Sequence, residues 1–350
     1  MQGFGYPGGQ LSSRALGTGG AVADFDANSP LNPASLVLAN RASVYAQYDP
    51  EFRSVRGTTG NASSTTARFP LLGISGRYGR ATFAFSFSNL LDRTWVNTYV
   101  DTESIGGRIV QSKVTAQSSG GISDVRAAAA WSFSNTFHVG AGIHVFPGEN
   151  RTVLGRDFAD SLQIGSFTQA NSYNFSGSAL SLGVLAVPVP HLNLALAARF
   201  GGSMHMRLAD TAEVGSASVP GRWSLSAAYD GFSGSMIAMR FSHENWSALR
   251  GLGSSGLTVR DVSDLSAGIE FAGPKIEGIA SAVRAGFRSR DLPFGVGSEP
   301  ARESALTAGV GVPFGAGRGA ADLTLARAHR TSGGAEETGW ILSIGFSIRP

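Results

Sequence analysis

From residue 42 to the C-terminus, apolar residues alternate with small or polar ones at a period of two. Phe83, Phe85 and Phe87 alternate with serine and alanine, and a second row begins at Trp223 and Leu225. Successive side chains of a β-strand point to opposite faces of its sheet. The pattern therefore predicts strands that each have one apolar face and one small or polar face.

The connections between these strands alternate between short and long. Short connections lie near residues 79–80, 135–136, 188–191, 230–234, 273–278 and 315–319, and long ones at about 50–65, 100–120, 149–171, 207–218, 248–262, 291–301 and 331–337. This order predicts fourteen strands, with both termini at the end of the short turns. An even number of antiparallel strands of about 10 or more residues is typical of outer-membrane barrels.

The polar faces of the predicted strands carry charged residues near their middle. They are Arg77, Arg126, Arg199, Arg222, Arg240, Arg284 and Arg288 on the basic side, and Glu244, Asp264, Glu270, Glu303 and Asp322 on the acidic side. The apolar faces are nearly free of charge and end in aromatic residues, as a lipid-facing surface requires, because one exposed Arg at mid-bilayer costs roughly 2–4 kcal/mol. We therefore predict an all-β transmembrane barrel rather than a soluble β fold. A propeller would need a repeat of about 40 residues, which the sequence lacks.

Residues 1–41 follow a different pattern, rich in glycine and small residues, without sustained alternation. Pro30 and Pro33 exclude regular helix or strand pairing around them. Such a segment cannot bury enough surface to stay ordered alone. We predict that residues 1–41 form a hatch inside the lumen of a barrel made by residues 42–350.

The charge of the chain and its first residues bear on its partners and on its location in the cell. The formal charge is +3 and the pI about 9.4, but the arginines are scattered, which argues against a nucleic-acid surface. No basic start followed by an apolar stretch marks a signal peptide, so we expect a bacterial outer-membrane protein whose leader has been removed.

The start of the chain resembles the FadL/TodX family of outer-membrane transporters of hydrophobic compounds. The residues that carry the resemblance are Gly3-Phe4, the run Leu16-Gly17 to Ala23, and above all Asn32-Pro33-Ala34 directly before the first strand. Looser matches are Gly121 to Arg126, Pro220-Gly221 and Arg284 to Phe287. The resemblance implies a fourteen-stranded barrel with an internal hatch, for passive uptake of a long-chain fatty acid or similar small hydrophobic molecule.

Two alternative functions remain open at this stage. PorV-type barrels share the Asn-Pro-Ala feature and serve secretion, which implies a structural barrel that binds a partner protein through its extracellular loops. A passive porin is the third interpretation. The chain also departs from the family pattern, because its third and fourth loops are short, and because residues 81–99 contain no Gly or Pro that would predict a kinked third strand.

The sequence contains no convincing catalytic constellation. His138 and His144 lie on the inward face of one predicted strand, where a hydrogen-bonded network is a better interpretation than a metal or proton-relay site. No Gly-x-Ser-x-Gly elbow occurs between a strand and a helix. We therefore predict a protein that is not an enzyme and that uses neither cofactor nor metal.

The arginine and carboxylate lining has two interpretations. It bonds the hatch to the wall and satisfies buried polar groups, or it binds an anionic head group, for which arginine is suited by its bidentate geometry. The predicted ligand-binding residues are Phe4, Tyr6, Leu11, Arg199, Arg240 and Arg284, and the predicted partners are outer-membrane lipid and a small hydrophobic ligand.

Overall fold

The computed structural model describes residues 5–39, 41–57, 60–158, 165–209, 213–252, 258–276, 278–295 and 300–349. The strands are β1 (Ser43–Gly57), β2 (Gly60–Tyr78), β3 (Ala81–Asp92), β4 (Trp95–Ile105), β5 (Arg108–Ser132), β6 (Phe137–Val145), β7 (Gly148–Phe158), β8 (Phe167–Val189), β9 (Leu192–Leu208), β10 (Glu213–Ser218), β11 (Arg222–Phe232), β12 (Ser235–Glu244), β13 (Val262–Ile276), β14 (Ile279–Leu292), β15 (Ala301–Phe314), β16 (Gly319–Ser332) and β17 (Ala335–Ile348). Short helices are α1 (Ser13–Gly17), η1 (Ala23–Phe25), η2 (Pro33–Leu38) and η3 (Trp246–Leu252).

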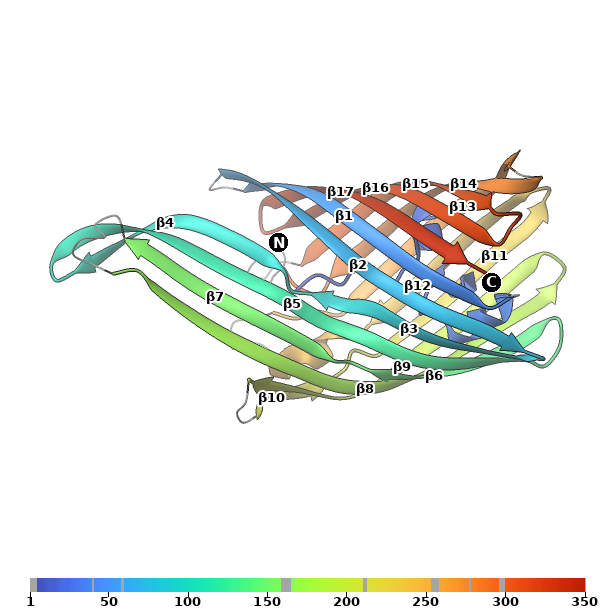
Figure 1. Cartoon of the computed structure of the whole chain (residues 1–350), viewed down its shortest axis with the longest axis horizontal. Helices are drawn as coiled ribbons and strands as arrows, with labels where there is room; N and C mark the ends of the chain where they lie inside the picture. Colours follow the sequence, from blue (N-terminus) through green and yellow to red (C-terminus); the bar gives the residue numbers. More distant parts are fainter. Residues whose placement is uncertain are drawn as a thin grey trace.

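The strands form one closed antiparallel barrel (Figure 1). Each strand pairs with its neighbour, and β1 pairs with β17 to close the sheet. Three staves of the barrel consist of two segments each, namely β3 with β4, β6 with β7, and β10 with β11. The seventeen segments therefore make fourteen staves, and the predicted strand number is confirmed.

Several predicted long loops are strands instead. In the range 100–120, β4 and β5 form a tight hairpin whose turn residues Gly106 and Gly107 have φ values of 58° and 80°. This hairpin, β7 and the first part of β8 extend far beyond the rest of the barrel (Figure 1). The sequence predicted loops here because these exposed strands lack a regular apolar face. In the structure, hydrogen bonds between neighbouring strands hold them together.

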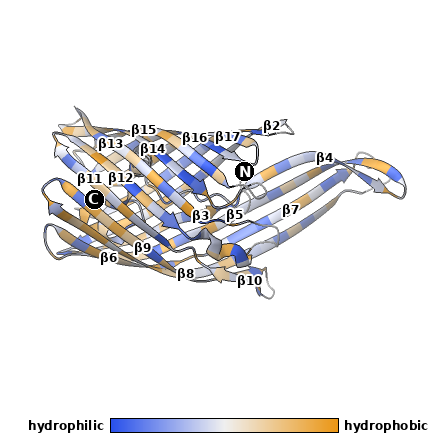
Figure 2. Cartoon of the chain, turned by 180° about the vertical axis from the view of Figure 1, so that it is seen from behind, coloured by the Kyte–Doolittle hydropathy of each residue, from blue (hydrophilic) through white to orange (hydrophobic). Residues whose placement is uncertain are grey.

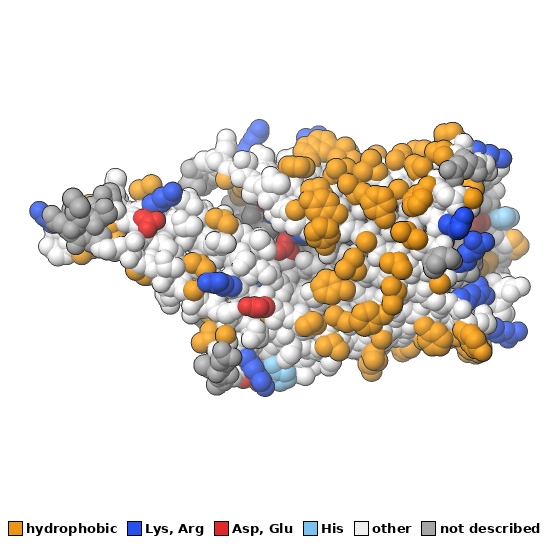
Figure 3. Space-filling model, viewed as in Figure 1, with side chains coloured by type: hydrophobic (Ala, Val, Ile, Leu, Met, Phe, Trp, Pro, Cys, Tyr) orange, Lys and Arg blue, Asp and Glu red, His pale blue; other side chains and the backbone are white. Residues whose placement is uncertain are grey.

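The outward face of the barrel is apolar. Ile143, Leu182 and Phe200 are 60%, 54% and 58% exposed. Apolar side chains form a band over the face of the barrel seen in Figure 3, and hydrophobic positions recur along the strands seen from behind in Figure 2. The inward face is charged, and Arg126 and Arg199 are 1% and 2% exposed. This sidedness confirms a transmembrane β-barrel. Arg77 corrects the predicted lining, because it lies exposed at the β2–β3 turn.

Residues 5–39 lie inside the barrel. Helix α1 packs against β14 to β17 and η2 against β3, β5, β6 and β8 on the opposite wall. Leu31, Leu36 and Val37 form an apolar core with wall residues such as Leu185. In the part of the chain that the structure describes, no helix is long and apolar enough to cross a membrane. That residues 1–41 form a unit separate from the barrel stays a prediction.

The Asn-Pro-Ala motif anchors this internal segment to the wall. The Asn32 side chain accepts a hydrogen bond from the Ala34 amide at 2.9 Å and donates one to the Asp24 carbonyl at 3.1 Å. Pro33 opens η2, where its missing N–H costs nothing. Two wall glycines allow the approach, because a Cβ on Gly183 would lie 1.9 Å from Asn32 Oδ1, and one on Gly140 would lie 2.4 Å from the Ala34 nitrogen.

Candidate functional site

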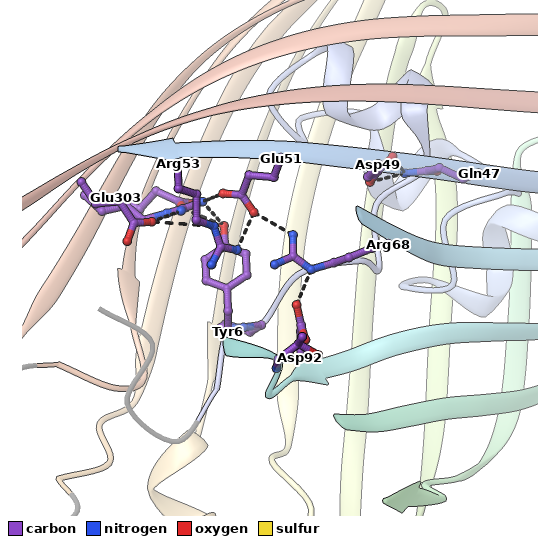
Figure 4. Close-up of polar contacts among 12 residues, drawn as sticks. Tyr6, Gln47, Asp49, Glu51, Arg53, Arg68, Asp92 and Glu303 are labelled. Atoms are coloured by element: carbon purple, nitrogen blue, oxygen red, sulfur yellow. Dashed lines mark hydrogen bonds and ion pairs between the residues drawn. The ribbon is translucent and has the colours of Figure 1, made fainter. Parts of the chain in front are cut away.

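Tyr6 lies at the centre of a buried charge cluster near the outer end of the lumen, the end that carries the long hairpins (Figure 4). Its hydroxyl donates to Glu303 Oε2 at 2.7 Å and accepts from Arg290 and Arg330 at 2.6 and 2.8 Å. Burial raises the pKa of the Tyr6 hydroxyl, while the two guanidinium groups partly oppose this. The phenol therefore keeps its proton and donates it to the carboxylate.

Four arginines surround the Tyr6 ring. The guanidinium carbons of Arg53, Arg68, Arg290 and Arg330 lie 5.4, 5.6, 5.2 and 4.5 Å from the ring centroid. The carboxylates that pair with them are Glu51, Asp92, Glu303 and Glu337. Four cations face four anions, so the cluster is close to neutral. A buried charge set of this kind is stable only while every member keeps its partners.

The main chain of Tyr6 is hydrogen-bonded to the wall. Its amide donates to the Asp92 carbonyl at 2.7 Å, and the Asp92 amide donates back at 2.9 Å, which makes an antiparallel bridge. The Asp92 side chain pairs with Arg68 on β2 at 2.5 Å. The residues 5–11, named here the N-terminal arm, are thus joined to β3 at its last residue.

The third stave is broken directly after this bridge. Strand β3 ends at Asp92 and β4 begins at Trp95, so the third stave is interrupted although residues 81–99 contain neither Gly nor Pro. The break needs no Gly or Pro, because Asp92 Oδ1 accepts from the Thr94 amide at 2.9 Å and turns the chain locally. The Arg93 amide donates to the Gly120 carbonyl instead of to β2.

A seam opens between β2 and this stave. Pairing of β2 with β3 ends at Leu71 and Ser88, and in the described residues β2 then pairs only with β1, while β4 pairs only with β5. The arm lies along the seam, since a Cβ on Gly9 would lie 2.7 Å from Pro70 on β2 and 3.1 Å from Asn89 on β3. The arm therefore fills the place of the missing ladder pairs.

A cavity of about 120 Å³ lies beneath the arm. Leu11, Leu16 and Leu31 line it from the internal segment, and Leu90, Trp246 and Val262 from the wall. The charged residues that line it are Arg68, Arg222, Arg240, Arg288 and Arg290, with Asp49, Glu244, Asp264 and Glu303. The cavity combines apolar side chains with charged and polar ones, which suits a small uncharged or amphipathic molecule.

Gln10 bonds the arm to side chains of β5 and β11. Its side chain donates to Asp124 at 2.8 Å and accepts from Arg222 at 3.1 Å. Asp124 also contacts His144 Nδ1 at 2.7 Å, and His144 Nε2 contacts the Ser181 hydroxyl at 2.9 Å. This Asp-His-Ser order matches the relay of a hydrolase. His144 and Ser181 are each 2% exposed, however, so these three residues form a structural link between the internal segment and the wall.

The structure brings some of the predicted ligand-binding residues together and separates others. Tyr6, Leu11 and Arg240 line the cavity, and Arg199 contacts Gln10 beside it at 3.5 Å. Arg284 lies elsewhere, bonded to Glu270 and Asp322 at 2.6 and 2.5 Å. Phe4 lies outside the described residues. A ligand role for these six residues stays a prediction.

Sequence reasoning missed Gln10 and Asp92, which link the arm to the wall. The only available signal for Asp92 was its type, since aspartate readily bonds the amide two residues on. No group of three or more potential metal ligands occurs among the residues that the structure describes. The sequence pointed to both His138 and His144, but only His144 bonds Asp124, so the two histidines do not share one site.

The class of fold is a hatch-filled fourteen-stranded transmembrane barrel. No family model matches the sequence, and a comparison with curated proteins finds no match. Among solved structures, the chain has the fold of the FadL/TodX transporters. It superposes on a Pseudomonas aeruginosa FadL homologue with a TM-score of 0.66 at 12% identity, covering 99% of both chains.

Two further solved structures share this fold. The P. putida toluene transporter TodX gives a TM-score of 0.63 at 12% identity over 99% of both chains. The monoaromatic hydrocarbon channel CymD gives 0.62 at 14% identity over 97% of both chains. These neighbours are described as channels and transporters, not as enzymes.

Proposed function

We propose that the protein is an outer-membrane channel for passive uptake of small hydrophobic molecules, gated by its N-terminal hatch. The single observation that carries the proposal is the apolar cavity under an arm that occupies a seam in the wall. A molecule that enters from the outer end reaches this cavity before it reaches the rest of the internal segment. Displacement of the arm opens both the cavity and the seam, without nucleotide or covalent chemistry.

The volume of the cavity favours a compact cargo. An engineered apolar cavity of about 150 Å³ in another protein binds benzene, and the cavity here has about 120 Å³. A long-chain fatty acid exceeds this space unless the arm moves away. The neighbours named for toluene and monoaromatic hydrocarbons support a cargo of the same size class.

The gate is proposed to be the arm and not the whole hatch. Asn32 to Ala34 dock into two glycine sites on the wall, and α1 is bonded to the opposite wall through Ser13 and Thr324, at 2.8 Å. The arm, in contrast, is held chiefly by the polar contacts of Tyr6 and Gln10. Binding of cargo would compete with the packing of Tyr6 and Leu11 against the cavity.

Deletion of residues 2–34 tests whether the hatch as a whole, which includes the arm, closes the lumen. The wild-type protein in liposomes should admit a monoaromatic compound and exclude a small sugar, whereas the deletion should admit both. Heat-modifiable migration in gels is the control that the barrel still folds. Hydrophobic uptake and sugar exclusion that are both unchanged by the deletion would contradict the proposal.

One observation favours a PorV-type binding function as the second candidate. The extension beyond the barrel has an open edge, because in the described residues β4 pairs with β5 alone. An exposed edge of eleven residues can accept a strand from a partner protein. A stoichiometric partner that co-purifies from solubilised outer membranes, and is lost when β4 is shortened, would support this candidate.

A further inference from the structure

The short turns at the inner end of the barrel carry their cations on one side only. Proceeding from β13 through β17 and β1 to β3, the exposed basic residues are Lys275, Arg318, Arg349, Arg41, Arg77 and Arg80. These six residues are named here the basic arc, and Figure 3 shows basic side chains gathered at this end, next to the apolar band. The other short turns, from β5 to β12, carry no Arg or Lys.

The basic arc has no ion-pair partner among the described residues. In the described residues no carboxylate lies within salt-bridge distance of any of the six cations, whereas the lumen arginines Arg284, Arg288 and Arg290 all have such partners. The sequence has one acidic residue in these turns, Glu277, which lies outside the described residues. The charge is therefore available to an external anion.

Aromatic and aliphatic side chains lie directly beside the cations. Tyr78, Phe346 and Ile348 are 84%, 50% and 56% exposed, and each is within a few residues of an arc cation. Two cations, Arg41 and Arg349, also line a cavity of about 680 Å³ at this end of the barrel, whose other charged lining residues are Arg14, Arg284, Asp26, Glu270 and Asp322. Arg77 donates to the Gly79 carbonyl at 3.1 Å, but none of the six cations has an ion-pair partner among the described residues. A surface with exposed apolar groups on one side and such cations on the other fits a lipid that has acyl chains and an anionic head group.

We propose that the basic arc binds the phosphate head groups of anionic phospholipids in the inner leaflet of the outer membrane. The inference rests on the membrane placement in the proposed function, with the short turns facing the periplasm. Arginine suits phosphate because its planar guanidinium group donates two parallel hydrogen bonds. Because the arc covers eight consecutive strands, it orders anionic lipid on the side of the barrel that contains β1 and β17.

Native mass spectrometry of the purified protein in detergent tests the proposal. The wild type should retain phosphatidylglycerol in preference to phosphatidylcholine with the same acyl chains. The triple variant Arg41→Gln, Arg318→Gln and Arg349→Gln should lose this preference by roughly a hundredfold, because each cation near an anionic surface contributes about fivefold. High salt should reduce the preference in the wild type.

The matched control removes three exposed arginines at the outer end, Arg151→Gln, Arg207→Gln and Arg302→Gln, and should keep the wild-type preference. Heat-modifiable migration checks that both variants fold. Equal retention of the two lipids by the wild type, or unchanged preference in the arc variant, would overturn the proposal. So would displacement of the lipid by millimolar inorganic phosphate, since the ligand would then be a free anion.

This measurement does not depend on transport. If hydrophobic uptake fails while the lipid preference stands, only the proposed function falls. If uptake stands while the preference is absent, only the lipid site falls.

Discussion

At the scale of single residues, Tyr6 joins the N-terminal arm to the barrel wall, two parts of the chain that could otherwise move independently. Its main chain bridges Asp92 on the broken third stave, and its hydroxyl completes the bonding of Glu303, Arg290 and Arg330. The ring fills the space between four guanidinium groups, which would otherwise repel one another. Loss of the hydroxyl takes away a buried acceptor from Arg290 and Arg330, whereas Glu303 Oε2 keeps its bond from Arg330 Nε.

We therefore expect Tyr6→Phe to loosen the arm while the barrel stays folded. The cost of the unsatisfied groups is about 1–3 kcal/mol, so hydrogen exchange at the Asp92 amide should accelerate about tenfold or more. Tyr78→Phe is the control, because Tyr78 is 84% exposed at the inner rim. Equal exchange rates in wild type and Tyr6→Phe would show that the hydroxyl does not hold the arm.

At the scale of elements, the strands that face lipid could be predicted and the broken ones could not. A row such as Trp223 to Tyr229 is visible because lipid on one side and polar groups on the other impose the alternation. The break after Asp92 depends on Tyr6, Arg68 and Gly120, which lie far away in sequence. The local sequence around Asp92 does not indicate contacts with residues so distant in the chain.

The same reasoning explains what could be predicted of the candidate site. The arginine-bearing lumen was visible because alternation places those residues inward, and Tyr6, Leu11 and Arg240 do meet at one cavity. The depth of each arginine along the barrel was not visible, which is why Arg284 lies with Glu270 and Asp322 instead. The depth of a residue along the barrel depends on strand register. The register could not be predicted because the long outer hairpins were interpreted as loops.

A disulfide between the arm and β3 should lock the gate. A Cβ on Gly5 lies 2.8 Å from Leu91 Cγ, close to the position that the sulfur of a Leu91→Cys variant would take. The native chain has no cysteine, so Gly5→Cys with Leu91→Cys introduces the only pair. We expect the oxidised double variant to lose hydrophobic uptake and to regain it on reduction.

Both single cysteine variants serve as controls, since neither can close the bridge. Uptake by the oxidised double variant at the wild-type rate would show that cargo passes without movement of the arm.

At the scale of the whole molecule, two surfaces of different character follow one another along the barrel axis. The apolar band covers the barrel proper, while the extension formed by β4, β5, β7 and β8 is mostly polar (Figures 2 and 3). Both surfaces expose apolar residues, for example Leu182 at 54% and Val100 at 69%. Exposure alone therefore does not separate them, but a bilayer does, because lipid cannot solvate a charge.

Arginine substitution at these two positions locates the membrane. Leu182→Arg places a charge in the apolar band and should cost about 2–4 kcal/mol, which lowers the fraction of heat-modifiable, folded protein in lipid vesicles. Val100→Arg adds the same side chain to the extension, in water, and should fold as the wild type does. The apolar band would not be a lipid surface if both variants folded equally well. A loss confined to Val100→Arg would place the bilayer around the extension instead.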